Sequence, residues 1–333
     1  MIIDIHAHVI PREVLRETAP NEAWRPRVYR DALGQQMVEL DGRTFDAAVR
    51  EFVNVEGILA AQDASGIERV VLSPPPFTSL FNYQISAREA QRSSRLQNES
   101  IARLVHDYPQ RIAGMGTVPL QDAQFAAREA AYIVNDLQLH AIEVGTNVNG
   151  LYLGDEQLLP FWEAAAALGA LVFIHPIAGI GGPLMRRYYL GNLYGNPAET
   201  GATAADIIFS GVLERFPSLK ILLAHGGGVL PSIIGRMDHG YRVRAEPRAR
   251  ISQPPSTYFK QFYFDTLTHS AQVLQQLIST VGADHILLGS DYPFDMGSEQ
   301  PRSIVEQLDL TGEQRDAILG RNAAHLLNMD AQG

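Results

Sequence analysis

The hydrophobic positions along this chain form short runs that alternate with longer segments of helical pattern. The runs are rich in Val, Ile, Leu and Phe, and several helical segments end at glycine, a common helix terminator. Near-continuous apolar strands are typical of a parallel sheet that is covered on both faces. The pattern predicts eight strands, at residues 2–6, 69–73, 111–118, 139–144, 170–175, 219–225, 261–266 and 285–291. Eight such units in a chain of this length predict an α/β fold, namely a closed (β/α)₈ barrel of the TIM type.

Two long segments interrupt this alternation. One covers about residues 11–54 after the first predicted strand, and the other covers residues 176–200 after the fifth and is rich in Gly, Pro, Tyr and Arg. Both follow the carboxyl ends of strands, where barrel enzymes place their active-site loops. We therefore interpret residues 1–333 as a single barrel domain with an insertion at about residues 11–54.

Histidine and aspartate side chains occupy the ends of four predicted strands. His6 and His8 are separated by one residue, so both imidazoles can face the same way on a strand. Three nitrogens and one oxygen suit Zn²⁺ with room for a water or a substrate, and Mn²⁺ accepts the same donors. The predicted ligands of one divalent ion are His6, His8, His175 and Asp291. His225, at the end of the sixth strand, is left as a base beside the ion.

Each of these residues also has a structural interpretation. An isolated H-x-H arises by chance, His175 before Pro176 could be a core histidine, and the three glycines after His225 could serve a tight turn. Asp291 could cap a turn. Their convergence at four strand ends favours the metal site. The remaining histidines are expected to be structural or exposed: His106, His140, His239, His269 and His285.

Composition narrows the classes of function. The chain has 333 residues and is 46% hydrophobic, which predicts a large core. Its formal charge of −10 predicts no nucleic-acid partner. Without cysteine, a metal must be held by His, Asp or Glu. No secretion signal or membrane span is recognisable, so we expect a cytoplasmic protein without a membrane partner. No nucleotide-binding glycine motif is present, so no organic cofactor is expected.

Four short motifs carry a resemblance to a known family. "DIHAHVIP", "FIHP", "LLAHGGG" and "LLGSDYPF" occur in this order across nearly the whole chain and resemble the amidohydrolase superfamily. "NPAET" and "IGRMDHGYRVR" resemble its aminocarboxymuconate semialdehyde decarboxylase branch. The resemblance implies the same metal ligands, an acid/base histidine at His225, and an Arg236 that reaches a carboxylate in the pocket of a partner subunit. It therefore implies a homodimer.

The chain departs from that branch at two positions. Asp46 stands where the branch carries a substrate-binding arginine, with Arg43 and Arg50 nearby. Tyr188 or Tyr189 replaces a tryptophan in the loop after the fifth strand.

The segments expected to wall the barrel mouth suggest the type of substrate. Guanidinium groups bind carboxylates, and aromatic rings can flank a planar body. The candidate arginines are Arg43, Arg50, Arg186, Arg187 and Arg236. The candidate aromatic side chains are Phe77, Phe81, Tyr188, Tyr189, Tyr194, Tyr292 and Phe294. Together they predict a small, planar carboxylic acid.

The sequence leaves three interpretations of function. The favoured one is a metal-dependent, non-oxidative decarboxylase of an unsaturated or aromatic acid, resembling aminocarboxymuconate semialdehyde or a hydroxybenzoate. It would use metal-bound water or substrate, with His225 and Asp291 as the acid/base pair. The alternative is a hydrolase or hydratase acting on a lactone, amide or enol acid. The third is a barrel without catalytic activity, for which four convergent ligands have no use.

Overall fold

The computed structural model describes the chain except for residues 20–21, 23, 41–42, 46–49, 178 and 330–333, and describes only the backbone at residues 43, 45, 50, 78 and 79. Eight parallel strands form one sheet in the order β1-β5-β6-β7-β10-β11-β12-β13. Their bounds are Ile3–His8, Arg69–Ser73, Ile112–Thr117, Ala141–Gly145, Leu171–His175, Lys220–Leu223, Tyr263–Asp265 and Ile286–Leu287, respectively. All eight predicted strands are present.

The first and last strands of this sheet meet and close it into a barrel. Ile5 N donates to Leu288 O at 2.8 Å, and Asp291 N donates to His6 O at 2.7 Å. These bonds confirm the predicted (β/α)₈ architecture. The predicted strand ends were less accurate. His225 and Asp291 lie beyond the ends of β11 (Leu223) and β13 (Leu287), and both have left-handed backbones (φ 57° and 58°), which are not strand conformations.

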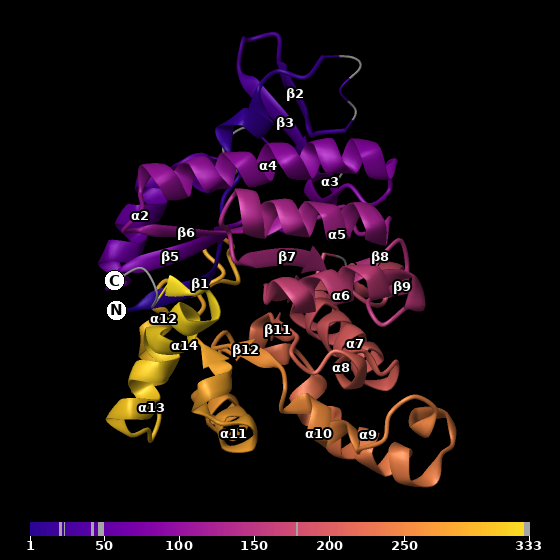
Figure 1. Ribbon diagram of the computed structural model, residues 1–333. Coiled ribbons are helices and arrows are strands. Elements are labelled where there is room, and N and C mark those ends of the chain that lie inside the picture. Colours follow the sequence, from indigo (N-terminus) through magenta and orange to yellow (C-terminus); the bar gives the residue numbers. More distant parts are fainter. Residues whose placement is uncertain (20–21, 23, 41–42, 46–49, 178, 330–333) are drawn as a thin grey trace.

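Helices cover the outside of the barrel (Figure 1); α4 packs on β6, and α5 packs against both α4 and α6. Local capping sets several helix starts; the Ser86 hydroxyl, for example, accepts from Glu89 N at the start of α4. The helices are α1 Arg50–Val53, α2 Val55–Ala64, α3 Thr78–Phe81, α4 Ala87–Asp107, α5 Ala123–Ala131, α6 Leu159–Leu168, α7 Asn196–Phe209, α8 Val212–Arg215, α9 Leu230–Val243, α10 Pro255–Phe259, α11 Ala271–Val281, α12 Pro301–Glu306, α13 Gly312–Asp316 and α14 Asn322–Leu326. Short 3₁₀ and π turns are η1 Arg12–Leu15, η2 Tyr132–Asp136, η3 Glu156–Leu158, η4 Gly182–Met185, η5 Gly191–Gly195, η6 His225–Gly227, η7 Glu246–Arg248, η8 Ala283–His285 and η9 Ala317–Arg321.

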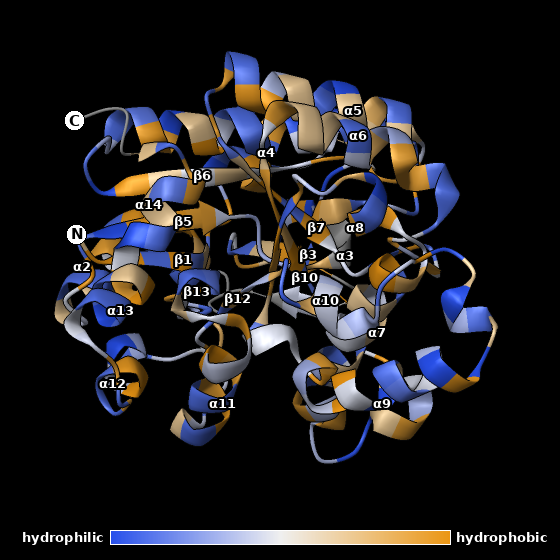
Figure 2. Ribbon diagram, turned by 60° about the horizontal axis from the view of Figure 1, so that its bottom comes forward, coloured by the Kyte–Doolittle hydropathy of each residue, from blue (hydrophilic) through white to orange (hydrophobic). Residues whose placement is uncertain are grey.

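The barrel interior is apolar at its amino end and polar at its carboxyl end. Figure 2 shows the strands mostly in the hydrophobic colour. The apolar layer, which α14 closes from below, contains Ile3, Ile5, Val71, Met115, Ala141, Leu171, Phe173, Leu222, Ala224 and Leu287. Two positions further along four of these strands, on the same face, the side chains are Ser73, Thr117, Glu143 and His175. On β12, Asp265 stands two positions after Tyr263, which packs against the apolar layer. The polar layer is therefore built by strand alternation.

A register shift in β1 turns its two histidines toward this polar layer. The pairing of β1 with β5 slips between Asp4 and Ala7. Ile3 and Ile5 pack inside the barrel, whereas Ala7 packs outside it. Strict alternation would have sent His6 outward with Asp4. The shift reverses the phase, so that His6 and His8 face the barrel interior.

A small antiparallel sheet is formed by the part of the sequence between β1 and α2. It comprises β2 Arg27–Arg30, β3 Gln36–Leu40 and β4 Arg43–Phe45. A second hairpin, β8 Asn147–Val148 with β9 Leu151–Tyr152, follows β7. The assignment of residues 11–54 as an insertion within one domain stays a prediction.

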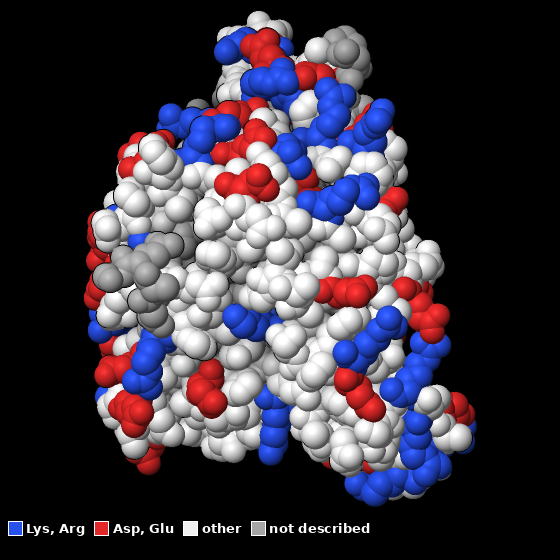
Figure 3. Space-filling view, in the orientation of Figure 1, with Lys and Arg blue, Asp and Glu red and all other residues white. Residues whose placement is uncertain are grey.

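Charges of both signs are mixed over the face in Figure 3. This face shows no broad field of one sign. Among the described residues, no helix combines the length and the apolarity needed to cross a lipid bilayer.

Candidate metal centre

Four of the predicted residues meet at the carboxyl end of the barrel. His6 and His8 come from β1, His175 from the end of β10, and Asp291 from the segment after β13. One ligand atom from each lies within 4.8 Å of all the others, and all four side chains are buried. Asp291 Oδ1 lies 3.1 Å from the Nε2 atoms of both His6 and His8, and 3.8 Å from His175 Nε2. The cluster could hold a metal ion.

The donor atoms of this cluster fit such an ion. Within the described chain, the Nε2 atoms of His6 and His175 are buried, and although Asp291 Oδ1 lies near each of them, neither makes a hydrogen bond of normal geometry. Buried polar atoms are normally paired, so these nitrogens indicate a missing ligand. The opposite ring nitrogens are occupied: His175 Nδ1 lies 3.0 Å from Pro176 O, and His8 Nδ1 lies 3.3 Å from Pro74 O. A carbonyl oxygen only accepts, so Nδ1 carries the proton and Nε2 offers its lone pair to a metal.

Asp265, at the end of β12, holds two parts of the site together. Its Oδ2 lies 2.7 Å from His6 Nδ1 and accepts from His225 N at 2.9 Å. Its Oδ1 accepts from Gly226 N and Leu267 N. One buried carboxylate thus orients a ligand histidine and fixes the turn that carries His225.

The electrostatics of the metal-free site follow from burial and from these carboxylates. Burial opposes a charge on His6, but Asp291 and Asp265 outweigh it and raise the pKa of His6 to about 10. Burial lowers the pKa of His175 to about 3 and also lowers that of His8. Burial would raise the pKa of Asp291, but His6 and the other histidines hold it well below its usual value. At neutral pH the site therefore holds one proton that an incoming cation must displace.

His225 differs from the four clustered residues. Its Nε2 lies 3.3 Å from Asp291 Oδ2, the oxygen that faces away from the histidine cluster, and its side chain is 18% exposed. Its left-handed backbone starts the run of glycines. Gly228 is required there, because a Cβ would collide with the Pro197 carbonyl. The turn thus presents an imidazole to open space beside the cluster.

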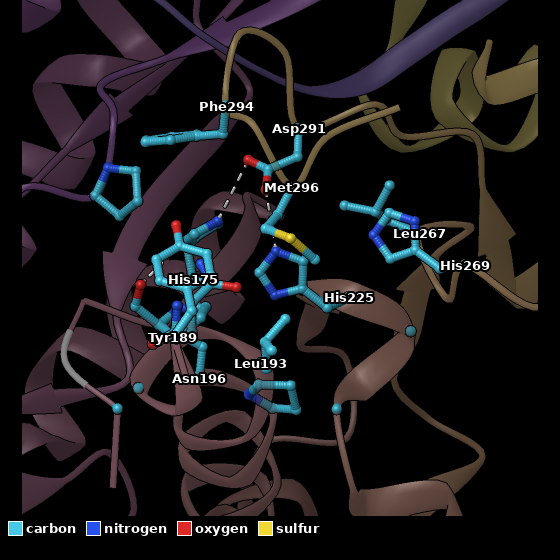
Figure 4. Close-up of a pocket in the computed structure, with 18 of the residues that line it drawn as sticks. His175, Tyr189, Leu193, Asn196, His225, Leu267, His269, Asp291, Phe294 and Met296 are labelled. Atoms are coloured by element: carbon cyan, nitrogen blue, oxygen red, sulfur yellow. Dashed lines mark hydrogen bonds and ion pairs between the residues drawn. The ribbon is translucent and has the colours of Figure 1, made fainter. Parts of the chain in front are cut away.

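The cluster opens into a cavity of about 760 Å³ (Figure 4). His175, His225 and Asp291 line its floor. Phe77 and Phe294 line one wall, and the Phe294 ring lies 5.3 Å from the His8 ring. The other lining side chains include Leu40, Met185, Arg186, Tyr189, Asn192, Leu193, Asn196, Ser232, Leu267, Thr268, His269 and Met296. This volume is typical of small-molecule sites.

The structure distributes the predicted substrate-binding residues unevenly. Phe294 lines the cavity, as does Tyr189. Tyr188 does not: it is 74% exposed and its hydroxyl accepts from Arg187, because successive left-handed residues turn the two tyrosines apart. Among the described lining side chains, Arg186 is the only Lys or Arg.

Arg187 and Arg236 do not line the cavity in the described part of this chain. Arg236 lies exposed on α9. The side chains of Arg43 and Arg50, and all of Asp46, lie outside the described residues. The predictions made for these three positions therefore stay predictions.

Sequence reasoning missed three residues. Asp265 ends the apolar run "QFYFD", and a carboxylate at a strand end was the available signal. Glu143 is a charged residue within the apolar strand "AIEVG"; it is fully buried beside His8. His269 was expected to be structural or exposed; it is exposed, but it lines the cavity.

The fold and the site together define a (β/α)₈ barrel with a candidate mononuclear metal centre at the carboxyl end of its strands. A family model described as amidohydrolase matches residues 3–329, and the chain belongs to this family. The chain is 32% identical to a 2-amino-3-carboxymuconate-6-semialdehyde decarboxylase of Dictyostelium discoideum, over 98% of this chain and 92% of that protein. It is 29% identical to a gamma-resorcylate decarboxylase of a Polaromonas species, over 80% and 85% of the two chains. The crystal structure of a 5-carboxyvanillate decarboxylase from Sphingomonas paucimobilis is 26% identical, with a TM-score of 0.83 over 98% of each chain.

Proposed function

We propose that this protein is a divalent-metal-dependent decarboxylase that removes CO₂ from a small, planar aromatic or unsaturated carboxylic acid without oxidising it. The observation that carries the proposal is the buried cluster of three histidines and Asp291, which opens into an aromatic-walled cavity with His225 on its floor. The decarboxylase names of the relatives support the same reaction.

The four ligands of the proposed ion are His6, His8, His175 and Asp291. Three imidazoles and one carboxylate suit Zn²⁺, and Mn²⁺ accepts the same donors. We propose one ion per chain, with Zn²⁺ as the first choice and no organic cofactor. When bound, the ion would polarise a substrate oxygen and stabilise negative charge that develops next to it.

The remaining work falls to side chains of this chain. Arg186 is placed to bind an anionic group of the substrate, and Phe77 and Phe294 to flank its planar body. Decarboxylation breaks the bond between the carboxyl carbon and the body, releases CO₂, and places a proton on the carbon left behind. His225, hydrogen-bonded to Asp291, is placed to hold and deliver that proton as general acid and base.

The experiment combines product analysis with deuterium labelling from the solvent. The zinc-loaded protein is incubated in D₂O with a panel of hydroxylated benzoates, carboxyvanillate and 2-amino-3-carboxymuconate semialdehyde. We expect CO₂ release and one deuterium at the carbon that carried the carboxyl group, both lost in His225→Ala. A panel of lactones is incubated in parallel. A product that keeps its carboxyl group and gains the mass of water would instead establish the hydrolase or hydratase.

We also propose a homodimer in which Arg236 serves the partner's pocket. Its support is the exposure of Arg236 on α9 together with the sequence resemblance. Sedimentation tests the assembly. Mixed dimers of Arg236→Ala and His225→Ala chains test the shared site, because such a dimer should contain one site with both residues intact and should regain activity. The cytoplasmic location stays a prediction.

A further inference from the structure

The ligand His6 faces the barrel interior because β1 contains one extra residue. Between its pairings with Val70 and Leu72 of β5, β1 runs from Asp4 to Ala7, which is three steps along β1 for two along β5. One extra residue in a strand reverses the face on which the following side chains lie. The metal site therefore depends on whatever holds this irregularity in place.

Asp4, at the start of the irregularity, is fully buried on the side of β1 that faces α2. Its Oδ1 accepts hydrogen bonds from His6 N at 3.1 Å and from Ser290 N at 3.0 Å. Its Oδ2 accepts from Gln62 Nε2 at 3.0 Å and from the Ser290 hydroxyl at 2.5 Å. A carboxylate has about four acceptor sites, so these bonds use all of them and fix its orientation.

The two bonds to Asp4 Oδ1 join two ligand-bearing parts of the backbone. An aspartate that accepts from the N–H two residues ahead of it competes with regular strand pairing, and here that N–H belongs to His6. Ser290 directly precedes the ligand Asp291, whose N–H donates to His6 O at 2.7 Å. One oxygen atom thus contacts the backbone of one ligand and of the residue next to another.

We propose that Asp4 is a positioning residue for the metal site. Its Oδ1 holds the irregularity of β1, and in this way it directs His6 into the cluster and keeps Asp291 beside it. Gln62 and the Ser290 hydroxyl bind the other oxygen and orient the carboxylate for this task. Asp4 acts through the place of one acceptor atom, and its negative charge is not what the metal site requires.

Two substitutions of Asp4 separate the place of this oxygen from its charge. Asp4→Asn removes the charge and keeps an oxygen at the position of Oδ1. Its new NH₂ group has an acceptor, because Gln62 Oε1 has no hydrogen-bond partner among the described residues and a turn of that amide presents it. The Ser290 hydroxyl can donate to His6 O, 3.3 Å away. Asp4→Glu keeps the charge, but its extra methylene group moves the carboxylate away from the two N–H groups.

The proposal rests on the metal site of the proposed function, and zinc affinity, measured by competition with a chromogenic chelator, tests the two separately. Wild type must first bind one equivalent; failure there would contradict the metal site itself. We expect Asp4→Asn to bind zinc within about threefold of wild type and Asp4→Glu about 10- to 100-fold more weakly, the usual effect of disturbing a group that orients a metal ligand. Asp4→Ala, which offers no acceptor, should match Asp4→Glu. Equal affinities of the Asn and Glu variants, or a weaker Asn variant, would overturn the positioning role alone.

A control variant and a second readout separate positioning from a general loss of stability. Glu129 is another fully buried carboxylate, but it pairs with Arg95 at 2.7 Å between α4 and α5, away from the cluster. Glu129→Gln should lower the melting temperature of the metal-free protein and leave zinc affinity unchanged. In the cobalt-loaded proteins, the visible absorption bands report the arrangement of the ligands. They should match wild type in Glu129→Gln and Asp4→Asn and differ in Asp4→Glu; wild-type bands in Asp4→Glu would count against the positioning role.

Discussion

The strand ends of the barrel and the segment of residues 179–195 face the same cavity, but they are built differently. The strand-end residues are buried and joined to one another: Asp291, Asp265 and three histidines share hydrogen bonds and ion pairs of 2.7 to 3.8 Å. The segment 179–195 is glycine-rich and exposed, with Leu184 85% and Tyr188 74% exposed.

This difference indicates which residues should control the reaction and which should control the choice of substrate. Side chains anchored on neighbouring strands can be held to the tolerance that metal binding requires. Residues 179–195 contribute Met185, Arg186 and Tyr189 to the cavity, and the Tyr189 hydroxyl donates to Asp295 Oδ1 at 3.2 Å. Substitutions at the strand ends should therefore change whether the reaction occurs, and substitutions in the segment should change which acid is accepted.

The largest effect is expected at Asp291. Its carboxylate contacts all three ligand histidines and His225, so Asp291→Ala removes a ligand and the partner of the base together. We expect both the bound metal and turnover to disappear. Elemental analysis of protein purified without chelator measures the first, and CO₂ release measures the second. Stoichiometric metal in this variant would contradict the assigned ligand set.

His225→Ala should lower turnover without loss of the bound metal. His225 is placed as base and not as ligand, so the variant should keep its ion while kcat falls by about 10²- to 10⁴-fold, the range of general acid/base catalysis. The same elemental analysis and a kcat measurement suffice. Loss of the ion would move His225 into the ligand set.

The pH dependence of metal binding comes next. In the metal-free protein, Asp291 and Asp265 raise the pKa of His6 to about 10 against the opposing effect of burial, so His6 is protonated below that pH. The ion needs the neutral imidazole, so binding must release this proton. Apparent zinc affinity should therefore rise about tenfold per pH unit, or about 100-fold from pH 6 to pH 8. Titration in buffers of different ionisation enthalpy counts the protons; an affinity independent of pH would refute the linkage.

The smallest effect is expected in the exposed segment. Arg186→Gln removes the only Lys or Arg in the described cavity lining, and a hydrogen bond to a charged group contributes about 1.5 to 3 kcal/mol. KM for an anionic substrate should rise about 10- to 100-fold, with bound metal and kcat little changed. Arg187→Gln is the matched control, because Arg187 points to Tyr188 and does not line the cavity. Equal effects of the two variants on KM would contradict the assignment of Arg186 as the residue that binds the anionic group.

The sequence alone determined the architecture and the core of the site. Alternating apolar runs and helical segments predicted all eight strands, because a parallel barrel buries both faces of every strand. Polar residues at the ends of such runs are easily recognised in a sequence. The sequence therefore predicted the candidate site residues His6, His8, His175, His225 and Asp291.

Only the tertiary structure decided the features that depend on contacts between distant segments. The register shift in β1 that turns His6 inward, and the contact of Asp265 with His6, arise from pairing between strands far apart in the chain. In the loops, the choice of Tyr189 over Tyr188 and of Arg186 over Arg187 depends on left-handed residues in an irregular segment. Regular elements repeat a periodic pattern that a sequence displays, whereas the direction of a loop side chain is set by backbone angles and neighbours that no periodicity encodes.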